Sequence, residues 1–321
     1  MTEQLLKIEN VYKYFPIKGT FFKKITAVDN VSLSINEGET LGIVGETGCG
    51  KTTLGKLMVK LLDPDKGNIF FKGKNVKKLK GKDLKWFRRN VQMVFQDPHS
   101  SLNPKMTIAE ILQEPLREHK IDVGNIEEFL IKRLEEVGME RGLLYRYPHE
   151  LSGGQKQRVA ILRASIINPS FIVFDEPTSS LDVSVQAQTL NLIKEMKRKY
   201  NLTYAFISHD LAVVRYMSEK IAVMYLGKIV EIGKSDEIFE NPLHPYTKVL
   251  ISSIPVPDYN LARKREKVRI VGEPPSLINP PRGCRFHPRC PFAMDICKEK
   301  EPQLIEIEKD HYVACWLYEK K

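Results

Sequence analysis

The feature that most constrains this chain is the glycine-rich octapeptide Gly45-Glu46-Thr47-Gly48-Cys49-Gly50-Lys51-Thr52, which fits the pattern GxxxxGK[ST]. It follows the apolar run Thr40–Val44 and opens a stretch with helical spacing, Lys51–Leu62. Glycines let successive backbone N–H groups point inward, and the helix adds the positive end of its dipole. A turn that only joins strand to helix is the alternative. The flanking pattern favours phosphate binding, and the motif alone predicts a nucleotide.

Two side chains of this loop have expected roles, and a second segment complements them. Lys51 is expected to reach the β- and γ-phosphates of a nucleotide, and the Thr52 hydroxyl to ligate Mg²⁺. The apolar run Phe171–Phe174 reads as a buried strand that ends in Asp175-Glu176. Asp175 can hold Mg²⁺, and Glu176 can act as the general base for an attacking water. Alone, such a pair is usually a helix start; together with the loop it indicates catalysis.

The pattern of apolar residues predicts an α/β protein. Strands are expected at Leu5–Val11, Val31–Ile35, Asn68–Lys72, Val91–Phe95, Tyr204–Ser208 and Ile221–Tyr225. A stretch with helical periodicity, roughly Thr107–Glu140, interrupts this alternation and predicts a helical insertion. The alternation favours a largely parallel sheet covered by helices. Beyond Ile254, frequent prolines and charges predict a linker and a small cysteine-bearing unit, with a boundary near residue 255.

Composition limits the cellular setting and the partners. The chain has 321 residues, a net charge of +10 and a pI of about 9.2, which would suit nucleotides, nucleic acid or an anionic membrane surface. The basic runs Lys72–Lys85 and Lys194–Lys199 are dispersed, so solvated faces are favoured over a nucleic-acid stripe. The start lacks a secretory signal, and no apolar run approaches the ~20 residues of a membrane span. The expected place is the cytosol, with any membrane role mediated by partners.

A third segment, Leu151-Ser152-Gly153-Gly154-Gln155, narrows the class. Alone, it reads as a helix N-cap followed by a glycine pair. Together with the phosphate loop, it makes residues 5–255 resemble the ABC ATPase family. The resemblance implies a P-loop NTPase (RecA-like) core with an antiparallel β subdomain and an α-helical subdomain at about residues 97–165.

The resemblance also implies roles for single residues. Gln96 matches the Q-loop glutamine, which contacts Mg²⁺ and the attacking water. Asp182, in Ser180-Leu181-Asp182, matches the D-loop, and His209 matches the switch histidine at the γ-phosphate. Phe15 best fits the aromatic that stacks on adenine, although Tyr14 and Phe21-Phe22 are neighbours. The implied catalytic residues are Glu176, His209 and Gln96. The implied Mg²⁺ ligands are Thr52, Gln96 and Asp175. The implied ATP contacts are Phe15, the loop residues Gly45, Glu46, Thr47, Gly48, Cys49, Gly50, Lys51, Thr52 and Thr53, and also Ser152, Gly153, Gly154, Gln155 and Asp182.

Family geometry implies a head-to-tail dimer in which the signature segment of one subunit closes over the phosphate loop of the other. The implied partners are a second ABC ATPase subunit, in a heterodimer or, as the alternative, a homodimer, together with two membrane permease subunits and an extracytoplasmic peptide-binding protein. The chain would then sit peripherally on the cytoplasmic face of the cell membrane. Nucleic acid is not an expected partner, because the core lacks the long coiled-coil or zinc insertion and the tandem ATPase domains of relatives that act on DNA or ribosomes.

The tail carries four cysteines spaced Cys284-x5-Cys290-x6-Cys297-x17-Cys315. With Asn241-Pro242-Leu243-His244-Pro245-Tyr246-Thr247, the tail resembles the oligopeptide and dipeptide permease ATPases, and chain length favours their F-type subunit. The resemblance implies a core at 1–255 and an extension at 256–321. Four thiolates can hold a [4Fe–4S] cluster or Zn²⁺. The loose spacing favours an iron–sulfur cluster over zinc, and four free buried thiols without a metal are a further alternative.

These observations predict an ATP hydrolase that drives import of oligopeptides or dipeptides. A nickel or glutathione importer shares the same tail and is the nearest alternative. A non-transport ABC ATPase that acts on nucleic acid is a more distant one.

Overall fold

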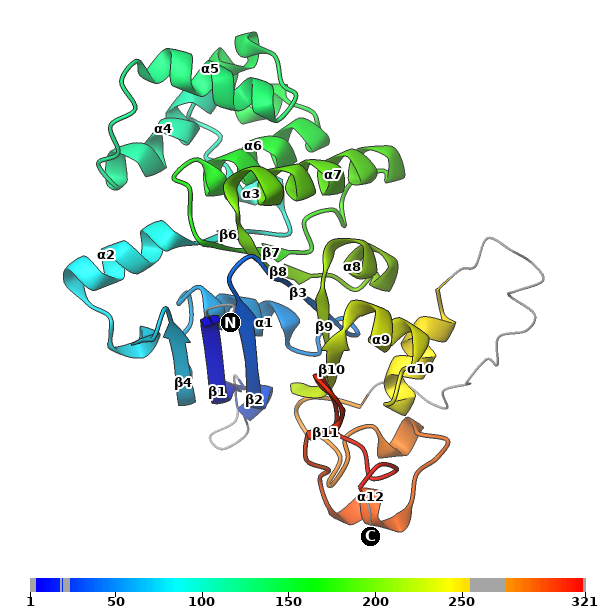
Figure 1. Cartoon of the computed structure of the whole chain (residues 1–321). Helices are drawn as coiled ribbons and strands as arrows, with labels where there is room; N and C mark the ends of the chain where they lie inside the picture. The colour runs from blue at the N-terminus through cyan, green and yellow to red at the C-terminus, as the bar shows by residue number, and fades with distance from the viewer. Residues whose placement is uncertain (1–3, 18, 20–23, 255–274, 320–321) are drawn as a thin grey trace. The chain divides into compact units, whose positions relative to one another are not determined.

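A computed structural model describes residues 4–17, 19, 24–254 and 275–319 (Figure 1). The chain forms two compact units, and each is taken by itself. The first consists mainly of residues 78–206. The second combines residues 5–35, 40–77 and 207–321. In the part of the chain that is described, no helix has both the length and the apolar character needed to cross a bilayer.

The second unit opens with an antiparallel sheet of order β2-β1-β4-β5. In β1, buried Leu6 and Ile8 alternate with the more exposed Lys7 and Glu9, which is the pattern of a sheet with one covered face. Leu6 pairs with Phe71 of β4. The strands span Gln4–Pro16 (β1), Lys24–Asn36 (β2), Lys66–Phe71 (β4) and Lys74–Asn75 (β5).

The same unit holds further strands in the order β11-β12-β10-β9-β3. β3 and β9 are parallel, whereas β9, β10, β12 and β11 pair antiparallel in turn. All five residues of β3 are buried, as expected for a short apolar run in a parallel pairing. These strands are Thr40–Val44 (β3), Lys220–Tyr225 (β9), Lys228–Lys234 (β10), Ile305–Glu308 (β11) and His311–Val313 (β12); the helices are Lys51–Met58 (α1), Leu211–Met217 (α8), Ser235–Glu240 (α9), Pro245–Ser252 (α10) and Asp295–Glu299 (α12).

The first unit combines three strands with a helical region. β6 pairs parallel with β7, and β8 follows β7 in the strand order. The predicted helical stretch is confirmed as two helices, whose starts are set by the N-caps Thr107 and Asn125. The elements are Gly81–Asn90 (α2), Val91–Val94 (β6), Pro98–Ser101 (α3), Ile108–Glu118 (α4), Ile126–Glu136 (α5), Gly153–Ser165 (α6), Phe171–Asp175 (β7), Val183–Tyr200 (α7) and Thr203–Ile207 (β8).

Two details differ from the sequence-based expectation. Helix α1 ends at Met58 rather than at Leu62. The tail is more than a cysteine-bearing appendix, because β12 pairs with β10 through Glu231↔Val313 and Ile232↔Tyr312. The described part of the extension therefore continues the sheet of the second unit and covers the edge of β10. The boundary expected near residue 255 falls on residues 255–274, outside the described residues.

Candidate functional site

The phosphate loop has the backbone that its glycines permit. Gly45, Gly48 and Gly50 have φ of +153°, +80° and +111°. A Cβ at Gly50 would lie 2.1 Å from the Ala27 carbonyl oxygen, so both the conformation and the space exclude a side chain. The loop joins buried strand β3 to the N-terminus of α1, as predicted. Its inward N–H groups and the helix end form an environment suited to an anion.

Lys51 lies inside this loop. Its side chain is 5% exposed, and Nζ donates hydrogen bonds to the carbonyl oxygens of Gly45 at 2.6 Å and Glu46 at 3.1 Å. Thr47 and Gly48, at the loop tip, are exposed, and Thr52 and Thr53 are half-buried. The ammonium group is thus held at the concave side of the loop, where phosphate oxygens would replace the carbonyls as its acceptors.

Glu46 is held at three points. Its N–H donates to the Tyr246 hydroxyl at 2.9 Å, its carbonyl accepts from Lys51, and its carboxylate accepts two hydrogen bonds from Arg289, each of 3.0 Å. Arg289 comes from the cysteine-bearing extension and is 7% exposed; it also reaches the Tyr225 hydroxyl at 3.3 Å. Arg289 was not predicted as a site residue, since no local sequence pattern marks it.

Three other candidate residues of the second unit, Cys49, His209 and Phe15, differ in their burial. Cys49 is buried, and burial raises the pKa of its thiol, so it acts as a packing residue. His209 is exposed directly before Asp210, the N-cap of α8. Phe15 is half-buried on β1, with Lys13 Nζ 5.8 Å from its ring centroid. Phe21 and Phe22 lie outside the described residues.

The first unit brings two predicted catalytic residues together. Gln96 Nε2 donates to Glu176 Oε2 at 3.3 Å. Glu176 has φ of +46°, and Asp175, at the end of β7, is 3% exposed. An amide and a carboxylate within hydrogen-bond distance form a pair that can orient a water and accept its proton.

The segment around Ser152 is the N-terminus of α6. Ser152 and Gln155 form a capping box: Ser152 N–H donates to Gln155 Oε1 at 2.9 Å, and Gln155 N–H donates to Ser152 Oγ at 3.3 Å. A Cβ on Gly154 would lie 2.6 Å from Val185 Cγ1 of α7, whereas one on Gly153 would have 4.0 Å to its nearest neighbour. The absence of a side chain at Gly154 thus lets α6 approach α7 closely, whereas Gly153 has free space beside it.

Asp182 begins α7. Its Oδ1 accepts hydrogen bonds from Val185 N–H at 3.0 Å and from the Ser184 hydroxyl at 2.8 Å, and the bond from Val185 lowers the pKa of the Asp182 carboxyl. The predicted site residues therefore fall into two sets. Phe15, the phosphate loop and His209 belong to the second unit; Gln96, Asp175, Glu176, the Ser152 segment and Asp182 belong to the first.

The four cysteines of the extension line one small cavity, together with aromatic residues such as Phe286 and Trp316. All four are free thiols, and burial raises the pKa of Cys284 to about 11 and of Cys315 to about 12. Within the described residues, no group of three or more His, Cys, Asp or Glu side chains is arranged to ligate a metal ion. Only the donor type fits a thiophilic metal, which would hold the thiols as thiolates.

A buried carboxylate anchors the segment Asn241–Thr247. Glu231 is 0% exposed; its two oxygens accept the N–H groups of Leu243 and His244, both at 2.8 Å, and Oε1 lies 2.8 Å from His311 Nε2. His244 in turn caps α10, with Nδ1 accepting Tyr246 N–H at 3.0 Å. The segment is distinctive in the sequence, whereas no local pattern marks Glu231 as its anchor. Through its contacts with Leu243, His244 and His311, Glu231 holds the start of α10, from which the Tyr246 hydroxyl reaches the phosphate loop.

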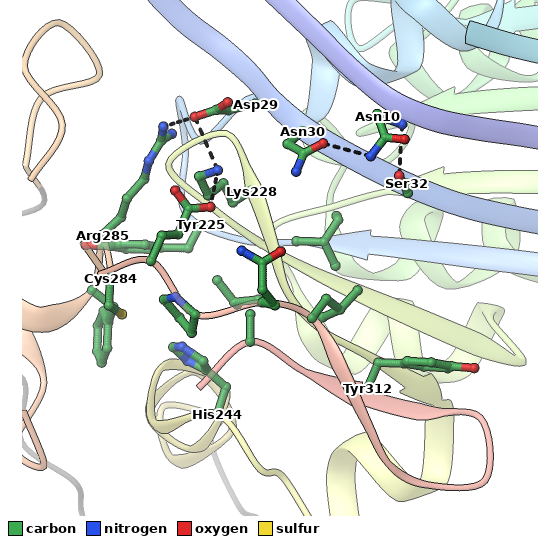
Figure 2. Close-up of a pocket in the computed structure, with 18 residues that line it drawn as sticks. Asn10, Asp29, Asn30, Ser32, Tyr225, Lys228, His244, Cys284, Arg285 and Tyr312 are labelled. Carbon is green, nitrogen blue, oxygen red and sulfur yellow. Dashed lines mark hydrogen bonds and ion pairs between the residues drawn. The ribbon is translucent and has the colours of Figure 1, made fainter. Parts of the chain in front are cut away.

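A cavity of about 360 Å³ lies where the extension meets β1, β2 and β10 (Figure 2). Arg285 of the extension pairs there with Asp29 and with the Leu226 carbonyl. Lys228 lies 3.3 Å from Asp29 and 2.5 Å from Glu301. These opposite charges balance, and they attach the extension to the core at a place separate from Arg289.

Two family profiles match the chain: the ABC transporter profile over residues 28–179, and the profile of the oligopeptide/dipeptide transporter C-terminal region over residues 230–297. The chain is 49% identical to the oligopeptide transport ATP-binding protein AppF of Bacillus subtilis (strain 168), with 98% of each chain covered. It is 45% identical to the oligopeptide transport ATP-binding protein OppF of Salmonella typhimurium (strain LT2), covering 97% of this chain and 95% of that one.

Among solved structures, the ATP-binding cassette MJ0796, in a dimeric post-hydrolysis state bound to ADP and Pi, aligns with a TM-score of 0.65. The identity is 29%, and the alignment covers 72% of this chain and 99% of that one. The expected P-loop NTPase fold, with antiparallel β and helical subdomains, is confirmed. The chain belongs to the ABC transporter ATP-binding proteins, in the oligopeptide and dipeptide transport group.

Proposed function

We propose that this chain energises import of oligopeptides or dipeptides through ATP-driven dimerisation and ATP hydrolysis. The observation that carries the proposal is the combination in one chain of a phosphate loop with Lys51 on its concave side and an extension matching the oligopeptide/dipeptide transporter profile. The relatives AppF and OppF, whose names state oligopeptide transport, support the same substrate class.

The loop residues have distinct roles in this proposal. The N–H groups from Gly45 to Thr53 bind phosphate oxygens, and Lys51 exchanges its carbonyl acceptors for the β- and γ-phosphates. Phe15 stacks on adenine, and His209 contacts the γ-phosphate. Because Lys51 is already desolvated and held in place, little reorganisation is needed when phosphate enters.

Hydrolysis is assigned to Gln96 and Glu176. Gln96 orients the water, and Glu176 takes its proton as the oxygen attacks the γ-phosphorus and the bond to ADP breaks. Thr52, Gln96 and Asp175 offer the oxygen donors that Mg²⁺ prefers, and these three would hold it. The ion supplies charge neutralisation for the phosphates.

The segment Ser152–Gln155 and Asp182 are assigned to the partner's nucleotide. The exposed Ser152 at the N-terminus of α6, followed by the open Gly153, supports a role in anion binding across a dimer interface. We infer a second ABC ATPase subunit as the partner, a heterodimer being favoured over a homodimer. In this arrangement each copy contributes half of two ATP pockets.

The assembly proposed around this dimer is a membrane transporter. Its other parts are two membrane permease subunits and an extracytoplasmic peptide-binding protein, and nucleic acid has no part in it. The chain would act at the cytoplasmic face of the cell membrane, peripherally. Residues 1–255 form the nucleotide-binding domain in this proposal, with a helical subdomain at about 97–165, and residues 256–321 form the extension.

The four cysteines are proposed to hold a [4Fe–4S] cluster, with Zn²⁺ as the alternative. The convergence of Cys284, Cys290, Cys297 and Cys315 on one cavity lined with aromatic residues supports a thiolate-bound group. Such a group would cross-link the extension, which has few regular elements. Metal analysis and absorption spectra of anaerobically purified protein distinguish iron–sulfur, zinc and free thiols.

Reconstituted transport tests the function. The chain, its companion ATPase, the permeases and the binding protein are placed in proteoliposomes with ATP inside, and uptake of labelled dipeptides, oligopeptides, glutathione and nickel is compared. Peptide uptake that disappears with Lys51→Ala, and falls at least 10²-fold with Glu176→Gln, is the expected result. Uptake of nickel or glutathione in place of peptide would assign the related importer class, and peptide uptake undiminished by Lys51→Ala would overturn the ATPase role.

A further inference from the structure

Arg289 joins the cysteine-bearing extension to the phosphate loop. Both of its terminal nitrogens donate to the Glu46 carboxylate, at 3.0 Å each, and the side chain is 7% exposed. Two parallel hydrogen bonds between planar groups fix orientation as well as distance, and burial limits screening by water and salt. The pair therefore defines the position of the second loop residue.

Glu46 connects the Arg289 pair to two other residues at the phosphate loop. The Glu46 carbonyl accepts a hydrogen bond from Lys51 Nζ, and the Glu46 N–H donates to Tyr246. Arg289 also touches the Tyr225 hydroxyl, and the Tyr225 ring packs against Tyr246 with centroids 4.6 Å apart. Arg289 thus supports the loop both directly and through the aromatic residues behind it.

We propose that Arg289 is a positioning residue for ATP binding: through Glu46 it holds the phosphate loop in its binding conformation, so that nucleotide affinity depends on the folded extension. Arg289 lies next to Cys290 and five residues after Cys284, so the residue that holds Glu46 belongs to the cysteine-bearing segment itself. The inference rests on the proposed function only in taking ATP as the ligand of the loop.

Arg285 provides a matched control. It comes from the same extension, its side chain is 9% exposed, and it pairs with a core carboxylate, Asp29, but it has no contact with the loop among those described. Arg289→Lys and Arg285→Lys each keep the charge and lose the two-pronged geometry. Both variants weaken the attachment of the extension, and only the first is expected to disturb the loop.

The first measurement is ATP binding to the full-length protein by titration with and without Mg²⁺. Arg289→Lys is expected to raise the Kd for ATP about tenfold, and Arg285→Lys less than twofold. Glu46→Gln is expected to match Arg289→Lys, and the double variant to be no worse than either single one, because both remove the same interaction. Equal Kd values for wild type and Arg289→Lys, or fully additive effects, would overturn the proposal.

The second measurement needs no nucleotide. Amide hydrogen exchange at residues 46–52 is expected to accelerate at least several-fold in Arg289→Lys and to stay at the wild-type rate in Arg285→Lys. If both variants lower the melting temperature alike and neither changes exchange at the loop, Arg289 only anchors the extension and the inference is wrong. Wild-type protein that binds no ATP, with loop exchange still dependent on Arg289, would instead contradict the proposed function.

Discussion

At the scale of single residues, the site depends on side chains held away from water with specific partners. His244 is the clearest case. It is 1% exposed, its Nδ1 accepts the Tyr246 N–H, and burial lowers its pKa from the ordinary 6.5 to about 4. The ring must be neutral to accept this hydrogen bond, so the cap of α10 is sensitive to acid.

A pH dependence of stability follows. Because the folded-state pKa lies below the unfolded one, the unfolded chain binds a proton that the folded chain excludes, and stability falls as the pH drops from 6.5 towards 4. The total contribution is roughly 3 kcal/mol. His244→Asn keeps an oxygen acceptor for the cap and does not titrate, so its free energy of unfolding should vary less with pH in this window.

Urea unfolding at a series of pH values measures the difference. The exposed His149→Asn is the control and should follow the wild-type curve. Parallel curves for wild type and His244→Asn between pH 6.5 and 4 would show that His244 is not the group responsible.

Residues of this kind also mark the limit of what the sequence predicted. The phosphate loop, the strand before Asp175 and the cap at Ser152 were predictable, because each depends on neighbours in the chain. Arg289 and Glu46 are 243 residues apart, and His311 and Glu231 are 80 apart. A single sequence contains no signal that pairs side chains so far apart, and Arg289 resembles any other arginine of a basic tail.

At the scale of elements, α6 and α7 pack closely because Gly154 has no side chain. Strands β11 and β12 were not predicted, because each has only three or four residues; β12 pairs with β10, and β11 pairs with β12. The helical region was predicted better, since α4 and α5 have clear N-caps and apolar faces.

The glycine pair at the start of α6 gives a matched test. Gly154→Ala would place a methyl group 2.6 Å from Val185 Cγ1, and a valine in a helix has little rotamer freedom to move aside. We expect a loss of about 1–3 kcal/mol in the free energy of unfolding. Gly153→Ala, which meets no close neighbour, should be neutral or slightly stabilising.

Chemical denaturation of both variants distinguishes them, and Val185→Ala should restore part of the stability of Gly154→Ala. Equal stabilities of the two alanine variants would mean that α6 and α7 do not need the close approach.

At the scale of the whole molecule, the predicted site residues are divided between the two units, and the proposed dimer supplies each ATP pocket from two copies. Glu176→Gln should bind ATP and hydrolyse it slowly, because the general base is lost while the phosphate loop is intact. With the companion ATPase present, we expect this variant to accumulate as an ATP-dependent dimer.

Light scattering or native mass spectrometry, with ATP and without it, measures the population of dimer. Ser152→Arg in the Glu176→Gln background is the control, because a bulky cation at the N-terminus of α6 should prevent closure over the phosphates. The arrangement would be contradicted by a monomer under all conditions, or by a dimer whose population depends neither on ATP nor on the Ser152→Arg substitution.

Some residues pair with partners that are synthesised much later in the chain, and this order has a consequence for biosynthesis. Glu46 and Glu231 leave the ribosome well before their partners Arg289 and His311. Until these partners have been made, the Glu46 carboxylate lacks the Arg289 guanidinium, and the buried Glu231 lacks one of its three hydrogen-bond partners. If Arg289 positions the phosphate loop as proposed, the loop reaches its full affinity for nucleotide only after residue 289 has been synthesised, and a nonsense mutation before that residue would weaken ATP binding as well as remove the extension.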